Sequence, residues 1–298
     1  MINTGYFHGY KGYRFFKISS THLPFSSYAE VYATIQYDSA LKNLMYGKVM
    51  FIETAVKNIT LEGILVNAQS EILQDIFEKV VSGYNNAPVG FKAEQRKKLQ
   101  QNKLNLQNKI QSYLAKAYGK NNPQITHFYN KVGTAGVPIW AILEIIMMGD
   151  LGFLLSCLTF EVRDDISKRL GLNLASDTNR QLVYKYLYAL KDLRNAIAHN
   201  SVVFDTRFSK IDASPAMKQC LMTEIRLPYI NFKTIGDYVI LICYYLKLLK
   251  VPKTEIRAFV RTFEQITYKY EEAVNQEVAA IVIHPDVKSR MKALEEYI

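Results

Sequence analysis

The segment LVYKYLYALKDLRNAIAH, residues 182–199, is the stretch that decides the fold class of this chain. Its apolar side chains recur every three or four residues, which is the period of a helix that buries one face. The stripe consists of Leu182, Tyr186, Ala189, Leu190, Leu193 and Ile197. Ser176 or Asp177 precedes it, and a short polar side chain can cap the first free amides of a helix. We therefore predict a helix that runs from one of these caps to about His199.

A cation, an amide and an imidazole lie near the C-terminal end of this predicted helix. Asn195 and His199 are four residues apart and share one helix face, and the long side chain of Arg194 can reach the same side. A guanidinium binds phosphate, and an imidazole transfers protons near neutral pH, which together is what RNA cleavage requires. The alternative is a helix-end pair of Arg194 and Asp192 beside a surface histidine.

Helical periodicity continues through most of the chain, whereas glycine, proline and strand-like alternation are sparse. Loops are expected at 83–90 and over most of 201–231. The pattern predicts an all-α protein in which residues 1–250 form one helical domain, with the aromatic segment 5–17 packed on it, and residues 251–298 form a C-terminal helical extension. One or two helices are expected over about 26–67. Single helices are expected over 92–118, 138–158, 164–170, 233–250 and 252–275, with a small one in the last twenty residues.

Composition narrows the classes of partner and compartment. The chain has 298 residues and a net charge of +10, which favours polyanions such as nucleic acid or an anionic membrane surface. The apolar run at 238–246 is too short to span a bilayer, and we expect it to form a buried helix. No strongly amphipathic basic helix with exposed aromatic residues is seen, so we expect no membrane partner, and no signal peptide is visible at the start. The three cysteines are widely spaced, as expected of buried, reduced thiols in a cytosolic protein. Because the histidines are scattered, we expect no metal and no cofactor.

One predicted helix, at 92–118, is strongly basic and contains the lone acid Glu94. A run of one sign can follow a phosphate backbone, although it is also typical of a solvated helix face. The residues that we expect to contact RNA are Lys92, Arg96, Lys97, Lys98, Lys103 and Lys109. At the N-terminus, aromatic side chains alternate with basic ones, and we favour packing onto the core over stacking on bases. These aromatic residues are Tyr6, Phe7, Tyr10, Tyr13, Phe15 and Phe16.

Four segments, taken in this order, resemble the abortive-infection proteins of the Abi-D and Abi-F kind, which belong to the HEPN superfamily of helical ribonucleases. They are GYFHGYKGYRFF (5–16), FIETAVKN (51–58), IWAILEIIMMG (139–149) and LRNAIAHN (193–200). The chain departs from the family pattern at Lys57, where arginine is frequent, and at Asn200, where a second histidine is frequent.

The resemblance implies a HEPN-like helical bundle and a metal-independent endoribonuclease that acts as a toxin in phage defence in the bacterial cytoplasm. His199 would be the acid–base group, Arg194 would hold the scissile phosphate, and Asn195 would orient the histidine or a phosphate oxygen, unless it makes a helix-terminal hydrogen bond. The resemblance also implies a homodimer that brings two copies of His199 into one cleft. A noncoding RNA or a protein antitoxin would restrain the enzyme.

Glu53 and Glu144 fall within largely apolar predicted helices, where a buried carboxylate needs a partner. Lys57, four residues after Glu53, is one such partner, and a second interpretation has one of the two carboxylates holding Arg194. Trp140 is expected in the core. The alternative to an enzyme is a non-catalytic HEPN-like module that binds RNA or a protein.

Overall fold

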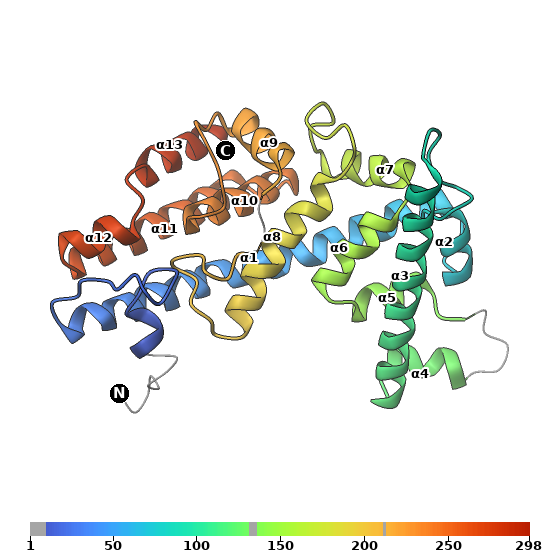
Figure 1. Cartoon of the computed structure of the whole chain (residues 1–298), viewed down its shortest axis with the longest axis horizontal. Helices are drawn as coiled ribbons and strands as arrows, with labels where there is room; N and C mark the ends of the chain where they lie inside the picture. The colour runs from blue at the N-terminus through green and yellow to red at the C-terminus, as the bar shows by residue number, and fades with distance from the viewer. Residues whose placement is uncertain (1–9, 131–135, 211–212) are drawn as a thin grey trace. The chain divides into compact units, whose positions relative to one another are not determined.

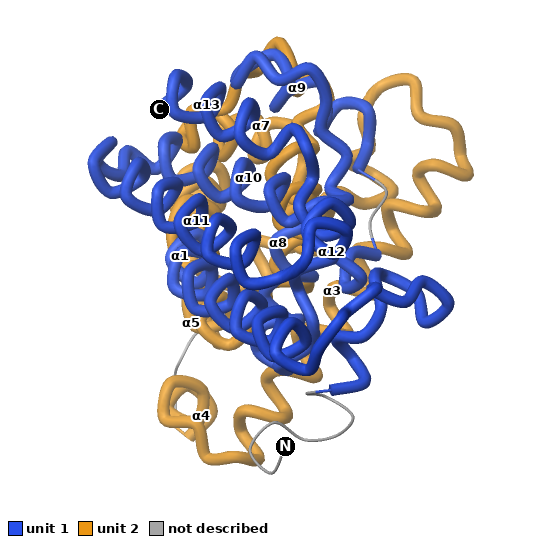
Figure 2. The backbone as a smooth tube through the Cα atoms, turned by 90° about the vertical axis from the view of Figure 1, so that its left-hand side faces the viewer, with its two compact units in different colours: residues 1–52, 189–298 blue, residues 53–188 orange. Residues whose placement is uncertain are grey.

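The computed structural model describes residues 10–130, 136–210 and 213–298. Within these ranges it contains the helices α1 to α13 and no strand, which confirms the all-α class (Figure 1). The chain divides into two compact units, which are residues 1–52 with 189–298 (unit 1) and residues 53–188 (unit 2) (Figure 2). The expected division at residue 250 stays a prediction. None of the described helices combines the length and the apolar character needed to cross a bilayer.

The region 26–67, where one or two helices were expected, forms the single long helix α1 (Tyr28–Ala68), which contributes to both units. The hydroxyl of Ser27 accepts a hydrogen bond from the Glu30 amide at 3.4 Å and so caps the first turn. In unit 1, Tyr37 of α1 stacks on Tyr270 with ring centroids 4.4 Å apart. This contact joins the first half of α1 to the C-terminal helices.

Unit 1 is built around α10 (Ile235–Leu248), whose residues from Ile235 to Leu246 are all buried. The apolar run at 238–246 therefore lies in the core, as predicted. Two helices pack on α10, namely α11 (Lys253–Ala273) and α13 (Val287–Tyr297). Two further helices pack on these: α9 (Pro215–Ile225) packs on α13, and α12 (Gln276–Val282) packs on α11. The helices expected at 233–250 and 252–275 are confirmed, and the last part of the chain holds two helices instead of one.

The irregular segment expected over 201–231 is wrong where α9 forms. The hydroxyl of Ser214 accepts a hydrogen bond from the Met217 amide at 3.4 Å, and Pro215 occupies the first helical position. Ser followed by Pro is a start signal for a helix, because Pro has no amide to leave unbonded there. Pro215 therefore starts a helix in a region where its presence predicted a loop.

Unit 2 is organised around the polar helix α3 (Ala93–Gly119), which packs on α4 (Pro123–Asn130), α5 (Ile139–Ile145) and α6 (Met148–Cys157). The single helix expected over 138–158 is wrong, because the backbone is extended at residues 146 and 147. Tyr113 of α3 accepts a hydrogen bond from the Met147 amide and donates one to Asp150, at 3.4 and 2.6 Å. A tertiary contact thus supplies the cap at which α6 starts.

The remaining helices of unit 2 are α2 (Leu73–Lys79) and α7 (Phe160–Leu170). α7 begins four residues earlier than expected and ends at Gly171, as predicted. The φ of Gly171 is +79°, a left-handed value that glycine adopts without steric cost. The loop expected at 83–90 is confirmed.

Candidate functional site

The helix α8 (Leu182–Ala198) carries the predicted apolar stripe and begins under a carboxylate cap. The side chain of Asp177 accepts hydrogen bonds from the amides of Gln181 and Leu182 at 2.7 and 3.1 Å. The cap is therefore Asp177, one of the two candidates, and regular helix starts a turn later than expected. The stripe is buried from Leu182 to Leu193, whereas Ile197 is partly exposed.

The C-terminal end of α8 is a Schellman motif that presents His199 to solvent. The amide of Ser201 donates to the carbonyl of Ala196 at 2.8 Å, and the amide of Asn200 donates to that of Ile197 at 3.0 Å. Asn200 has a φ of +51°, a left-handed conformation that asparagine adopts more readily than most residues. His199 therefore occupies the cap position, and its side chain is exposed.

Arg194 and Asn195 contact each other one turn before His199. The Arg194 guanidinium donates to the Asn195 side-chain oxygen at 3.0 Å, and both residues are half-buried. Asn195 thus orients Arg194, a role that the sequence analysis did not anticipate. Within the described ranges the His199 side chain makes no hydrogen bond or ion pair, so it is accessible to a ligand.

The electrostatics of this helix end favour Arg194 as the group that binds an anion. The last carbonyls of a helix carry partial negative charge, so the C-terminal end of α8 does not itself attract phosphate. Arg194 is the cation nearest to His199 along the helix. A guanidinium and an exposed imidazole at one helix end can hold a phosphate and transfer a proton.

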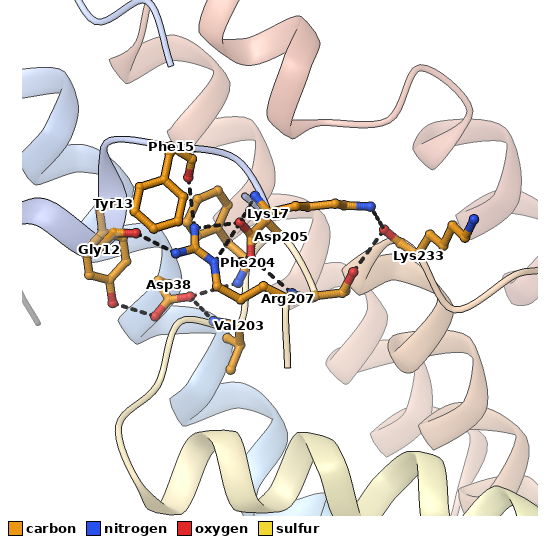
Figure 3. A network of polar contacts seen from close by, with 11 residues as sticks. Gly12, Tyr13, Phe15, Lys17, Asp38, Val203, Phe204, Asp205, Arg207 and Lys233 are labelled. Carbon is orange, nitrogen blue, oxygen red and sulfur yellow. Dashed lines mark hydrogen bonds and ion pairs between the residues drawn. The ribbon is translucent and has the colours of Figure 1, made fainter. Parts of the chain in front are cut away.

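The chain that leaves this helix end is held by a buried polar hub centred on Asp38 of α1, which is 0% exposed (Figure 3). One carboxylate oxygen accepts hydrogen bonds from the amides of Val203 and Phe204 at 2.7 and 2.8 Å. The other oxygen accepts from the Tyr13 hydroxyl at 2.7 Å and pairs with Lys42 at 2.7 Å. Burial and the neighbouring carboxylate raise the pKa of Tyr13 well above its usual value, so Tyr13 stays a donor.

Lys42 links this hub to the end of α8. Its ammonium donates to the side-chain oxygen of Asn200 at 2.9 Å while it pairs with Asp38. The residue that follows His199 is therefore tied to α1 by a nearly buried cation. Asp38 and Lys42 are four residues apart on an apolar helix, the same pattern that singled out Glu53 and Lys57, so the sequence did carry a signal for this pair.

The chain beyond the hub is fastened to the N-terminal segment through Asp205 and Arg207 (Figure 3). Asp205 accepts from the Lys17 amide at 2.6 Å and pairs with Arg207 at 2.6 Å. The same guanidinium donates to the carbonyls of Gly12 and Phe15 at 2.9 and 2.8 Å. These contacts hold residues 12–17 against the loop that leaves α8.

The described N-terminal aromatic residues pack onto unit 1, as predicted. Tyr13 and Phe16 lie against Phe204 with ring centroids 6.0 and 6.3 Å apart, and the Arg207 guanidinium lies 4.2 Å from the ring centre of Phe15. Tyr6 and Phe7 lie outside the described residues.

The two predicted supporting carboxylates differ in burial. Glu53 is 3% exposed, and its carboxylate lies 3.5 Å from the ammonium of Lys57, as expected. Glu144 is exposed, so the expectation of a carboxylate in apolar surroundings is wrong there. Trp140 is not a core residue either, because it is 37% exposed and its indole donates to Glu71 at 3.2 Å. The helix α5 is short and turns these two side chains outward.

The basic residues of α3 do not form one continuous face. Lys92, Lys97 and Lys98 are exposed, whereas Arg96 donates to the Phe91 and Tyr84 carbonyls. Of the remaining two predicted contact residues, Lys103 is half-buried and Lys109 is exposed. Burial lowers the pKa of Lys103, and Lys109 pairs with Asp150 at 2.8 Å.

No group of three or more His, Cys, Asp or Glu side chains in the described part of the chain is placed to hold a metal ion. The three cysteines, Cys157, Cys220 and Cys243, are buried thiols outside any disulfide, as predicted.

The comparisons with known proteins concern the first two thirds of the chain. The family model described as Abi-like protein matches residues 1–205. The match includes the Asp38 hub and ends just after His199, leaving α9 to α13 outside it. No curated protein and no solved structure matches the chain. Because the family model covers more than half of the sequence, the chain belongs to the Abi-like protein family.

Proposed function

We propose that this protein is an endoribonuclease that acts as a toxin in abortive infection, with its active site at the C-terminal end of α8. Membership of the Abi-like family suggests abortive infection, and the finer assignment rests on one observation. The exposed imidazole of His199 stands at a helix end that also carries Arg194, within the residues that the family model matches. An exposed imidazole without a structural partner is suited to proton transfer.

The reaction that fits these groups uses the ribose 2′-hydroxyl as nucleophile. His199 takes the proton from this hydroxyl, the 2′-oxygen bonds to phosphorus, and the bond to the 5′-oxygen breaks. Arg194, oriented by Asn195, stabilises the negative charge on the phosphate oxygens. The products carry a 2′,3′-cyclic phosphate and a 5′-hydroxyl, and no step calls for a metal ion.

The leaving 5′-oxygen needs a proton from an acid, and His199 of a second copy would supply it. We therefore propose a homodimer with two copies of His199 in one cleft. Glu53 and Glu144 remain candidates for supporting roles. The exposed basic residues Lys92, Lys97 and Lys98 are the part of α3 best placed to contact RNA phosphates.

An unrestrained ribonuclease would damage its host, so the proposal includes a noncoding RNA or protein antitoxin and a location in the bacterial cytoplasm. The second candidate is a non-catalytic module that binds RNA or a protein through the same surfaces.

The test is RNA cleavage by purified protein in EDTA, with analysis of the fragment ends. We expect wild-type protein to produce 2′,3′-cyclic phosphates and His199→Ala to be slower by about 10²-fold or more. Arg194→Ala should lose about 10²-fold or more, because it removes the group that stabilises the transition-state charge. His127→Ala, which removes another exposed imidazole, is the matched control and should cleave like wild type.

Equal cleavage by wild type and His199→Ala would contradict the assignment of the site. A further sample is wild-type protein that has been freed of any copurifying antitoxin and exposed to lysate of phage-infected cells. If this sample binds RNA but does not cleave it, the non-catalytic module is favoured.

A further inference from the structure

A cavity of about 220 Å³ lies in unit 1, and its lining comes from residues 16–17, residues 204–205, the start of α10, the end of α12 and the turn after it, and the start of α13, together with Tyr37 and Thr267. It is smaller than the roughly 300 Å³ at which pockets for drug-sized ligands begin, but one water occupies only about 30 Å³. The space therefore suits a small polar ligand. Most of its lining belongs to the C-terminal part of the chain, beyond the residues that the family model matches.

The first turn of α10 presents unbonded amides to this cavity. Thr234 and Asp237 cap each other's amides, which leaves the amides of Ile235 and Gly236. Both residues line the cavity and are buried, and within the described ranges neither amide has a hydrogen-bond partner. Free amides at the N-terminus of a 14-residue helix attract anions, because they combine hydrogen-bond donors with the positive end of the helix dipole.

A buried arginine that contacts the first turn of α10 also has unused hydrogen-bonding capacity. Arg290 of α13 lines the cavity and is 2% exposed. Its terminal nitrogens bond to Asp237 and Thr234, whereas its Nε has no partner within the described ranges. A buried donor without a partner is costly, so an acceptor supplied by a ligand would stabilise this wall.

Two lysines add positive charge at the cavity. The Lys17 ammonium donates to the Lys233 carbonyl at 2.9 Å, which leaves two of its three hydrogens for other acceptors (Figure 3). The side chain of Lys233 is exposed, and within the described ranges it makes no hydrogen bond or ion pair. The nearby carboxylates of Asp205 and Asp237 already pair with Arg207 and Arg290, so the two lysine charges are not balanced.

We propose that this cavity binds a phosphate-sized oxyanion, held by the Ile235 and Gly236 amides, the Arg290 Nε and the ammonium groups of Lys17 and Lys233. The anion is inorganic phosphate or the terminal phosphate of a small phosphorylated molecule. Burial lowers the pKa of Lys17, and a bound anion would oppose that effect. The proposal does not depend on the ribonuclease assignment, because it concerns different residues.

The experiment follows the backbone amide NMR signals of the full-length protein during titration with inorganic phosphate, at ionic strength held constant with chloride. We expect saturable shifts at Ile235 and Gly236, and an affinity at least about tenfold lower in Lys233→Ala, because a charge-assisted hydrogen bond is lost. Lys269→Ala removes an exposed lysine of α11 in the same unit and should bind phosphate like wild type. Lys17→Met is a second variant, and its circular dichroism spectrum establishes that it is folded.

A parallel titration with a nucleoside 5′-monophosphate distinguishes the two sources of the phosphate. Tighter binding of the nucleotide than of inorganic phosphate would identify a phosphorylated small molecule as the ligand, and the reverse would identify free phosphate. The proposal is overturned if chloride reproduces the shifts, if no saturation occurs, or if Lys233→Ala and folded Lys17→Met both bind like wild type.

Discussion

Replacing Asp38 by asparagine tests the buried hub that anchors the end of α8. Asparagine keeps one side-chain oxygen, which can still accept from the Val203 and Phe204 amides. The other oxygen becomes an amide group that donates, and it would face the Tyr13 hydroxyl and the Lys42 ammonium, which are also donors. The substitution therefore removes two charge-assisted contacts at a site that is 0% exposed.

The magnitude follows from these lost contacts. Removing one partner of a buried ion pair costs about 3–5 kcal/mol, and the Tyr13 hydrogen bond falls within that range because it shares the same carboxylate oxygen. We expect Asp38→Asn to lower the free energy of unfolding by about 3–5 kcal/mol. Lys42→Met should cost about 1–3 kcal/mol, because the Asp38 carboxylate keeps three hydrogen-bond donors.

The assay is urea unfolding followed by far-UV circular dichroism, with both single variants and the double variant. Because the two residues contact each other, the double variant should lose about 1–3 kcal/mol less than the sum of the single losses. Lys48→Met is the matched control on the same helix, since its pair with Glu255 at 3.8 Å is partly exposed and worth about 0–1 kcal/mol. Additive losses, or an Asp38→Asn variant within about 0.5 kcal/mol of wild type, would refute the reasoning.

Four further predictions use other parts of the chain. Gly47→Ala should stabilise α1 by about 0.5–1 kcal/mol, because its added Cβ meets nothing within 4 Å. Gly63→Ala should destabilise the protein by about 1–3 kcal/mol, because its added Cβ would lie 2.6 Å from Ile166, and urea unfolding measures both effects. Burial raises the pKa of the Cys157 thiol to about 11, and all three cysteines are buried. Iodoacetamide at pH 8 should therefore label none of the three in folded protein and all three in denaturant, and mass spectrometry counts the labels. Desolvation, followed by the charge of Glu295, raises the pKa of Glu264, so the Glu264→Gln variant should be more stable than wild type near neutral pH. This difference in stability should disappear as the pH falls below the pKa of the carboxyl in the unfolded chain, and thermal unfolding across this pH range measures it. If the hub positions His199, Lys42→Met should lower RNA cleavage more than Lys48→Met does at equal protein stability, measured on the fragments described above.

Local pattern determined the helical elements, because helix periodicity and cap residues act over a few neighbouring positions. The stripe of α8, the helical character of α1 and the burial of α10 follow from spacing and composition, whereas the choice of Asp177 over Ser176 as the cap came from the structure. The sequence also placed Arg194, Asn195 and His199 at one helix end, since residue spacing along a helix fixes which side chains are neighbours. Family membership follows from the sequence as well.

Tertiary contacts decided what spacing could not. The break between α5 and α6 depends on Tyr113, which comes from another helix, and the outward direction of Trp140 and Glu144 depends on what covers α5. The hub that joins Asp38 to the Val203 and Phe204 amides spans more than 160 residues of sequence, and the cavity at α10 combines residues from six separate segments. Partners this distant along the chain are chosen by the packing of whole helices, because a buried polar group must find its hydrogen-bond partner wherever the fold brings one.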